Sequence, residues 1–110
     1  MIEDMTGSRK KGGLKMAVKI IIRRRIPKGK EAQVLPLLLD LRAKAITQPG
    51  YISGETLINI TDPEDYVVIG TWKSVDHWKA WEASEERGKI QSKIDARLSE
   101  KALCAVYFYG

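Results

Sequence analysis

The sequence predicts a single α+β domain in which helices cover one face of a four-stranded antiparallel sheet. Stretches rich in β-branched and aromatic residues alternate with stretches that have helical apolar spacing, in the order β-α-β-β-α-β. The length of 110 residues suffices for one hydrophobic core but not for two. Serine residues stand where the later helices should begin, which is typical of helix N-caps.

The first half of the chain is predicted to form a strand, a helix and a strand. The run AVKIIIRRRI predicts a strand at about residues 17–26. An apolar helical stripe then predicts a helix over residues 31–48, which ends at QPG because proline cannot continue it and glycine tolerates left-handed angles. Pro36 lies inside this stretch, so we expect a kink or a later start there. A strand follows in YISGETLINI, where Gly54 marks a bulge or a close approach.

The second half is predicted to form a strand, a helical region and a final strand. TDPED is a turn by its Asp and Pro content, and YVVIGTW is a strand. Ser74 fits the N-cap of a short helix over about Val75–Ala83, and Ser84 can cap a second segment. KALCAVYFYG closes the chain as the fourth strand. The resulting βαββαβ order is that of ferredoxin-like folds.

Both faces of the predicted sheet are apolar, which bears on assembly. In the last strand, Cys104, Val106 and Phe108 alternate with Ala105 and Tyr107. An antiparallel sheet with one solvated face should instead alternate apolar with polar residues. Two helices can cover one face, so the other needs a second cover. We therefore expect a homodimer in which the sheets of two copies pack face to face.

Positive charge is concentrated near the start of the chain. Residues 1–30 contain ten Lys or Arg and two acidic residues, whereas residues 31–110 contain nine and twelve. Residues 1–15 are polar and predict a flexible basic N-terminal tail, ahead of a domain at residues 16–110 with Met16 as an alternative start. The basic half raises RNA binding as an alternative function, and the βαββαβ order is shared with RNA-recognition domains. Their aromatic strand signature is absent, which argues against nucleic acid as a partner.

Composition sets further limits on compartment and chemistry. The sequence has no apolar run of about 18 residues and no apolar signal region at its start, so we expect no membrane association and a cytoplasmic location. Cys104 is the single cysteine and His77 the single histidine, which gives neither a disulfide nor a metal-ligand spacing. We therefore expect no metal and no other cofactor.

Five segments of the chain together resemble a known family. They are MAVKIII, QPGYISGETL, VIGTWKS, HWKAW and VYFYG, spread over Met16 to Gly110. The sequence resembles the antibiotic biosynthesis monooxygenase domain family, small proteins of the dimeric α+β barrel class. The resemblance implies oxygen insertion into a small phenol or quinol, with the substrate anion reducing O₂ and no metal or flavin taking part.

The resemblance also extends to a branch of the family that degrades haem. The pattern of that branch can be compared with this sequence at three positions. Its pattern implies an Asn on the first strand, a Trp at the end of the third and a haem-ligating His on the following helix. Trp72 matches, whereas Ile22 and Gln91 stand at the positions aligned with the Asn and the His. Haem degradation is therefore not expected.

Five residues are the candidates for the site. Trp72 and Arg87 are predicted to bind substrate, since Trp72 ends the third strand and Arg87 falls inside an apolar helical stripe. Gln91 borders that stripe and, with His77, is the candidate for assisting proton movement. Tyr107 is a further candidate for substrate binding. Each also has a plain structural explanation as a core, interface or surface residue. A non-catalytic, dimeric, small-ligand-binding module of the same fold thus stays open beside the monooxygenase.

Overall fold

The computed structural model describes residues 16–110, and the predicted tail of residues 1–15 lies outside the described residues. Seven elements follow one another in the order β-α-β-β-α-α-β. They are β1 (Val18–Arg25), α1 (Glu31–Ile46), β2 (Tyr51–Asn59), β3 (Asp62–Trp72), α2 (Val75–Glu82), α3 (Glu85–Asp95) and β4 (Leu103–Phe108). The predicted ferredoxin-like α+β fold is confirmed, with its second helix divided into α2 and α3.

The four strands form one antiparallel sheet in the order β2-β3-β1-β4. The register places Val18 of β1 between Trp72 of β3 and Phe108 of β4. Two residues further on, Ile20 lies between Gly70 and Val106. Because side chains alternate along a strand, this register fixes which residues share each face of the sheet.

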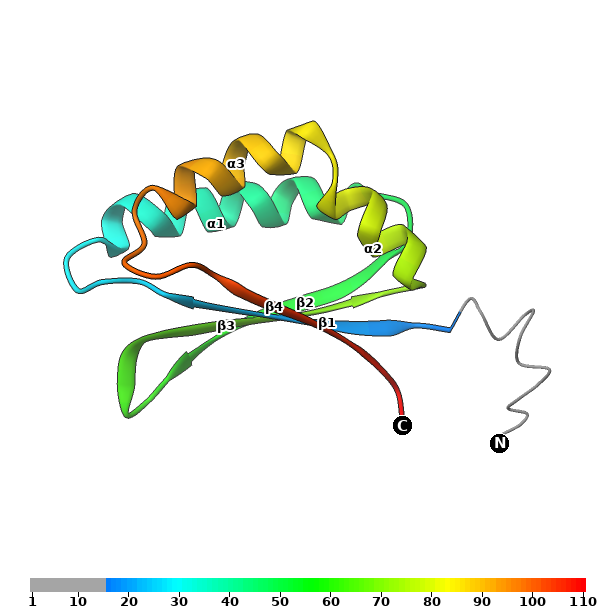
Figure 1. Cartoon of the computed structure of the whole chain (residues 1–110), viewed down its shortest axis with the longest axis horizontal. Helices are drawn as coiled ribbons and strands as arrows, with labels where there is room; N and C mark the ends of the chain where they lie inside the picture. Colours follow the sequence, from blue (N-terminus) through cyan, green and yellow to red (C-terminus); the bar gives the residue numbers. More distant parts are fainter. Residues whose placement is uncertain (1–15) are drawn as a thin grey trace.

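All three helices lie on the same side of the sheet (Figure 1). In that view α1 and α3 run side by side above the strands, and α2 lies at the end of the layer, where β3 leads into it. The buried core lies between the two layers, and it includes Val18 and Ile20 from the sheet and Val34 and Ile94 from the helices. Even-numbered residues of β1 face this core, which explains the alternating burial of that strand.

No described helix covers the other face of the sheet, called the open face below (Figure 1). Its apolar residues from the two middle strands are partly buried by their neighbours, whereas Tyr107 and Leu103 of the edge strand are 53% and 66% exposed. The open face also carries Leu57, which is 46% exposed. The covered face is largely apolar as predicted, whereas the open face mixes apolar residues with polar ones, among them Lys19, Arg23 and Thr71.

Local details confirm the helix caps and correct one expectation about the first helix. The Ser74 and Ser84 hydroxyls accept the backbone N–H groups of His77 and Arg87 at 3.3 and 3.1 Å. The helix α1 begins at Glu31 and continues through Pro36, so a later start is wrong.

The predicted TDPED turn is shorter in the structure. Only residues 60–61 form the turn, and β3 already begins at Asp62. The register of β2 shifts between Tyr51 and Ser53 and again between Ile58 and Asn59, rather than at Gly54. Within residues 16–110, no helix combines the length and the apolar character needed to cross a bilayer.

Candidate functional site

A cavity of about 70 Å³ lies between the sheet and the three helices. Two glycines side by side in the register, Gly54 and Gly70, form part of its floor. Since neither has a side chain, the helices cannot rest on the sheet at this point. The rest of the lining is mainly apolar, and its members include Ile20, Ile22, Leu38, Leu41, Val68, Trp72, Trp78 and Trp81.

The two floor glycines are not equivalent. A Cβ built on Gly54 would lie 2.7 Å from the Tyr51 hydroxyl oxygen, so a side chain there would displace the tyrosine. A Cβ on Gly70 would find ordinary contacts, the nearest at 3.5 Å from Nε1 of Trp72. The expected close approach at Gly54 is therefore confirmed, while Gly70 leaves space that an alanine would fill.

Aromatic side chains form one wall of the cavity. The ring of Trp72 meets those of Tyr51 and Trp78 edge-on, with centroid distances of 5.4 and 5.8 Å. Arg87 lies over Trp78, with its guanidinium carbon 5.3 Å from the ring centroid. Edge-to-face contacts and a cation over an indole are both favourable arrangements. The cluster thus fixes Trp72 and Arg87, which α3 and the end of β3 bring to the same cavity.

Three arginines line the cavity, and the lining contains no carboxylate. Arg24 is only 2% exposed and donates from Nη2 to Oε1 of Gln91 at 2.7 Å. Gln91 in turn donates to Asp95 at 2.7 Å. Arg42 donates to the Thr56 hydroxyl at 3.0 Å. The ion pairs found within residues 16–110 involve other cations.

Two buried donors at the cavity have no hydrogen-bond partner within residues 16–110. They are Nε of Arg24 and Nε1 of Trp78. Burial, and after it the nearby charge of Arg87, lower the pKa of Arg24 to about 10, while Asp95 opposes the shift. Burial also lowers the pKa of Arg87. Both guanidinium groups stay charged at neutral pH, so the cavity holds cations that its own residues do not neutralise.

The structure brings together some of the predicted site residues and separates others. Trp72 and Arg87 line the cavity, and Gln91 reaches it through its bond to Arg24. Tyr107 lies on the open face of the sheet, opposite Lys19 in the register, and so it points away from the cavity. The expected ligand contact of Tyr107 is not supported by this position.

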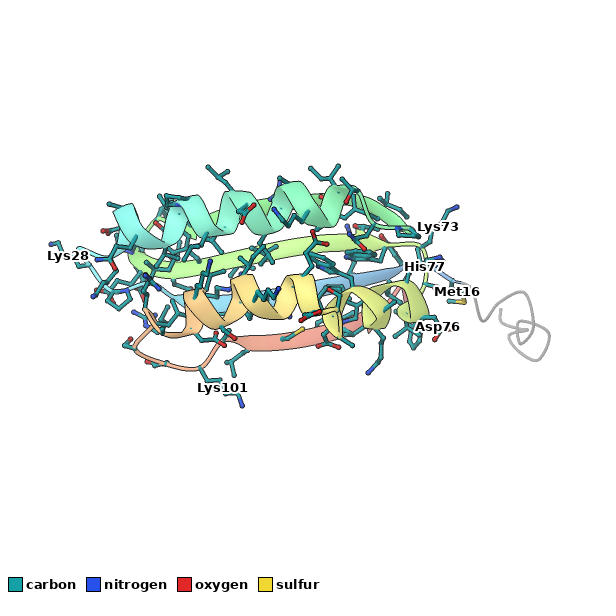
Figure 2. All side chains as sticks on the ribbon, turned by 90° about the horizontal axis from the view of Figure 1, so that it is seen from above. Met16, Lys28, Lys73, Asp76, His77 and Lys101 are labelled. Carbon is teal, nitrogen blue, oxygen red and sulfur yellow. The ribbon has the colours of Figure 1, made fainter. Side chains whose placement is uncertain are left out.

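His77 also lies outside the lining. It sits near the start of α2, at the end of the molecule where Met16 lies (Figure 2). Its Nδ1 lies 2.8 Å from the Ser74 hydroxyl oxygen. The ring packs on Gly50, which has φ +87° and whose Cβ, if present, would overlap the ring. In this structure His77 supports the turn before β2 and the start of α2.

Sequence analysis missed Arg24, although a signal for it existed. Arg24 shares its face of β1 with Val18, Ile20 and Ile22, which are all buried. The neighbouring Arg23 lies on the open face and pairs with Asp65 at 2.9 Å. A single even-numbered arginine at the end of a buried apolar row therefore marks a cation that faces the core.

The basic strand offers little support for nucleic-acid binding within the described residues. Arg23 pairs with Asp65, and Arg25 lies near Asp62, Glu64 and Glu100 at 2.9 to 3.9 Å. These acidic groups compete with phosphate for the two arginines. The remaining basic residues of the predicted tail lie outside the described residues.

Solved structures share this architecture. A conserved protein from Methanosarcina mazei Go1 has a TM-score of 0.82 at 14% identity, over 87% of this chain and 95% of its own. SnoaB from Streptomyces nogalater, described as a cofactor-independent oxygenase, has a TM-score of 0.78 at 17% identity, over 86% and 94%. A structure described as an antibiotic biosynthesis monooxygenase has a TM-score of 0.77 at 20% identity, over 84% and 98%. At these identities the likeness establishes the fold alone.

Sequence comparison goes further than structural likeness. No curated protein matches the chain. The family model for antibiotic biosynthesis monooxygenase, however, matches residues 17–93, which run from β1 almost to the end of α3 and hold every residue that lines the cavity. The match covers well over half of the chain, so the protein belongs to the antibiotic biosynthesis monooxygenase family.

Proposed function

We propose that the protein is a cofactor-independent monooxygenase that acts on a small aromatic, hydroxylated compound. The observation that carries the proposal is that Trp72 and Arg87 line the same mainly apolar cavity between sheet and helices. An apolar site limits water, and a cation in it stabilises a phenolate or enolate more strongly than the same cation in solvent. Family membership supports the monooxygenase class.

The proposed reaction needs no electron donor other than the substrate. A phenol that reacts with O₂ to give a quinone and water forms one new C–O bond and loses one C–H and one O–H bond. The substrate gives four electrons, and O₂ takes them, with one oxygen atom entering the product and the other leaving as water. Arg87 would favour the substrate anion that begins this transfer, because a nearby positive charge lowers the pKa of a bound phenol.

The proposal is tested by oxygen uptake with a panel of quinols and phenols. We expect uptake above background with at least one compound, no product under anaerobic conditions, and a fall of roughly 100-fold in kcat/KM for Arg87→Met. Trp72→Phe should reduce kcat/KM less, because it removes an indole N–H from the cavity but keeps an aromatic ring. Absence of uptake across the panel, or uptake that neither substitution alters, would contradict the proposal.

Gly70→Ala provides a test that does not remove any polar group. The substitution should fill part of the cavity floor without backbone strain, because its φ lies outside the left-handed region and the nearest contact is 3.5 Å. We expect a higher KM with an unchanged or slightly raised melting temperature, since glycine weakens a strand interior. An unchanged KM would place the substrate elsewhere.

A non-catalytic binding module is the second candidate, and the lining itself favours it. The cavity lining contains no histidine and no carboxylate, which are the side chains that most often act as general bases. An enzyme with this lining would have to take its substrate already ionised or ionise it through the arginines alone. Calorimetric binding of a panel compound without oxygen uptake would support the module.

We also propose that the protein is a homodimer through the open face. The apolar residues of that face, among them Leu57, Leu103 and Tyr107, lie where no described helix covers them. A second copy presents the same surface, and a two-fold interface needs only such self-complementarity. This assembly would leave the cavity on the outer side of each sheet, facing the helices.

A further inference from the structure

We propose that the cavity binds a small aromatic carboxylate and that Arg24 is the residue that anchors its negative charge. The inference rests on the proposed function in taking this cavity as the substrate site, and it adds the charge and size of the ligand. It concerns a residue on the first strand, whereas Trp72 and Arg87 lie on β3 and α3.

The first support is the incomplete bonding of Arg24. A guanidinium has five N–H donors, and within residues 16–110 the hydrogen bond found for this one goes to Gln91. The residue is only 2% exposed, and its Nε is buried without a hydrogen-bond partner within the described residues. A buried charge without a counter-charge is costly, and proteins usually pair or hydrogen-bond such groups. An acceptor that enters the cavity would supply what is missing.

The second support is that other donors converge on the same space. Arg87 lies over Trp78, whose buried Nε1 also has no partner within the described residues. Arg24 and Arg87 are close enough that the charge of Arg87 lowers the pKa of Arg24. Two cations and an indole N–H therefore surround a cavity whose lining has no acidic side chain. A ligand with negatively charged oxygens complements this set.

Gln91 and Asp95 show that Arg24 is held in place rather than left loose. Gln91 accepts from Arg24 and donates to Asp95, both at 2.7 Å. The carboxylate of Asp95 thus reaches Arg24 only through an intervening amide. This arrangement orients the guanidinium but leaves its charge for another partner, so Gln91 acts as a positioning residue.

The volume of the cavity sets the size of the ligand. A space of about 70 Å³ is roughly half of a cavity of about 150 Å³ that accepts benzene. The aromatic wall around Trp72 and Trp78 suits one flat ring. The ligand should therefore carry no more than one ring, and side chains of the lining would have to shift to admit it.

A carboxylate fits the charge better than other anions. It is ionised above a pKa of about 4, and it accepts two parallel N–H bonds from one guanidinium. A phenol ionises near pH 10 in water and carries one oxygen. Inorganic phosphate is strongly hydrated and offers no ring to the apolar wall. A hydroxybenzoate provides both the carboxylate and the electron-rich phenol that the proposed reaction needs.

The decisive measurement compares 4-hydroxybenzoate with 4-hydroxybenzamide by titration calorimetry. The two molecules have similar shapes and differ in charge. We expect the wild-type protein to bind the acid roughly tenfold or more tightly than the amide. Arg24→Met should remove this difference, and Arg24→Lys should retain part of it because the charge remains but the planar fork is lost. Arg97→Met, on an arginine that donates to the Lys93 carbonyl and does not line the cavity, should behave as wild type.

Thermal unfolding of the ligand-free protein separates an anchoring role from a structural one. If the charge of Arg24 is unpaired until an anion binds, Arg24→Met removes an uncompensated buried charge from the ligand-free protein. The melting temperature of the variant should then equal or exceed that of the wild type. A clear fall in melting temperature without any change in the preference for the acid would contradict the inference. So would equal binding of acid and amide by the wild type, binding of neither, or binding of inorganic phosphate as tightly as the acid.

Oxygen uptake distinguishes this inference from the proposed function. Charge-selective binding that depends on Arg24 but gives no oxygen uptake would uphold the anion site and reject the monooxygenase. Oxygen uptake with neutral phenols that Arg24→Met leaves unchanged would uphold the monooxygenase and reject the anion site.

Discussion

Two neighbouring arginines of β1 show how differently the two faces of the sheet treat the same side chain. Arg23 points to the open face, where its side chain is 56% exposed and pairs with Asp65 at 2.9 Å. Arg24 points to the covered face, where it is 2% exposed and has an amide as its partner. The open face neutralises its charge with a residue from β3, whereas the covered face keeps a charge unneutralised beside a cavity.

The two faces therefore lack different things. The cavity on the covered face lacks a negative charge, which a ligand can supply, and the open face lacks cover, which another protein surface can supply. Protein interiors rarely contain a cation without a carboxylate partner unless another group supplies the negative charge. The open face lacks only apolar cover, which a second copy of the chain would provide. Three predictions test this division, and they are taken from the largest expected effect to the smallest.

Truncation of the covered face should have the largest effect. Trp78 is 3% exposed and contacts both Trp72 and Arg87, so Trp78→Ala should lower the free energy of unfolding by about 3–5 kcal/mol. That loss should not depend on protein concentration. Tyr107→Ala on the open face should act through assembly, so its effect on stability should grow at higher protein concentration. Denaturant unfolding at two protein concentrations measures both effects. A loss of stability in Trp78→Ala that depends on protein concentration would contradict this distinction between the two faces.

A charge at the centre of the open face should come next, by breaking the dimer. Ile69 faces away from the helices and pairs with Ile21 in the register. Ile69→Glu would bring like charges together across a two-fold interface, at a cost of several kcal/mol. Sedimentation should give twice the chain mass of 12.4 kDa for the wild type and 12.4 kDa for the variant. Leu39→Glu, at a 71% exposed position of α1, is the matched control and should not change the mass. A wild type that sediments as a single chain would refute the dimer.

Acidification should have the smallest effect on stability. Hydrogen bonds from Asn59 and then Arg23 hold the pKa of Asp65 below its usual range. A carboxyl with a lowered folded pKa stabilises the fold above its unfolded pKa of about 3.9, and this stabilisation is lost as pH falls through the folded value. Melting temperature should therefore fall on acidification, and Asp65→Asn should weaken that dependence while lowering the melting temperature at pH 7. Parallel acid profiles for the two proteins would show that this carboxyl makes no contribution.

Much of the fold could be predicted because it depends on local patterns. Ser74 and Ser84 stand before helical stretches, and both hydroxyls cap as expected because an N-cap needs only residues three positions apart. The alternation along β4 correctly separated its two faces. Trp72 ends a predicted strand and Arg87 falls inside an apolar helical stripe, and both line one cavity, whereas their role in substrate binding stays a prediction.

The rest depended on which residues meet across the sheet. The cavity floor exists because Gly54 and Gly70 pair with each other, and only the register of β2 and β3 brings them together. Arg24 looked like one member of a basic run until the helices showed which face of β1 is buried. His77 stood near two tryptophans in sequence, but its bond to Ser74 and its contact with Gly50 take its ring away from them.

The position of the tryptophans has a practical consequence. The chain contains three, and all of them line the cavity. Indole fluorescence from this protein therefore arises from one place, with no distant tryptophan to dilute a change there. The edge-on contact of Trp72 with Trp78 and the guanidinium over Trp78 should make the emission sensitive to polarity and to any ring that enters. The protein thus contains an optical reporter of its own cavity, and it needs no label to follow filling, emptying or opening of the helix layer in real time.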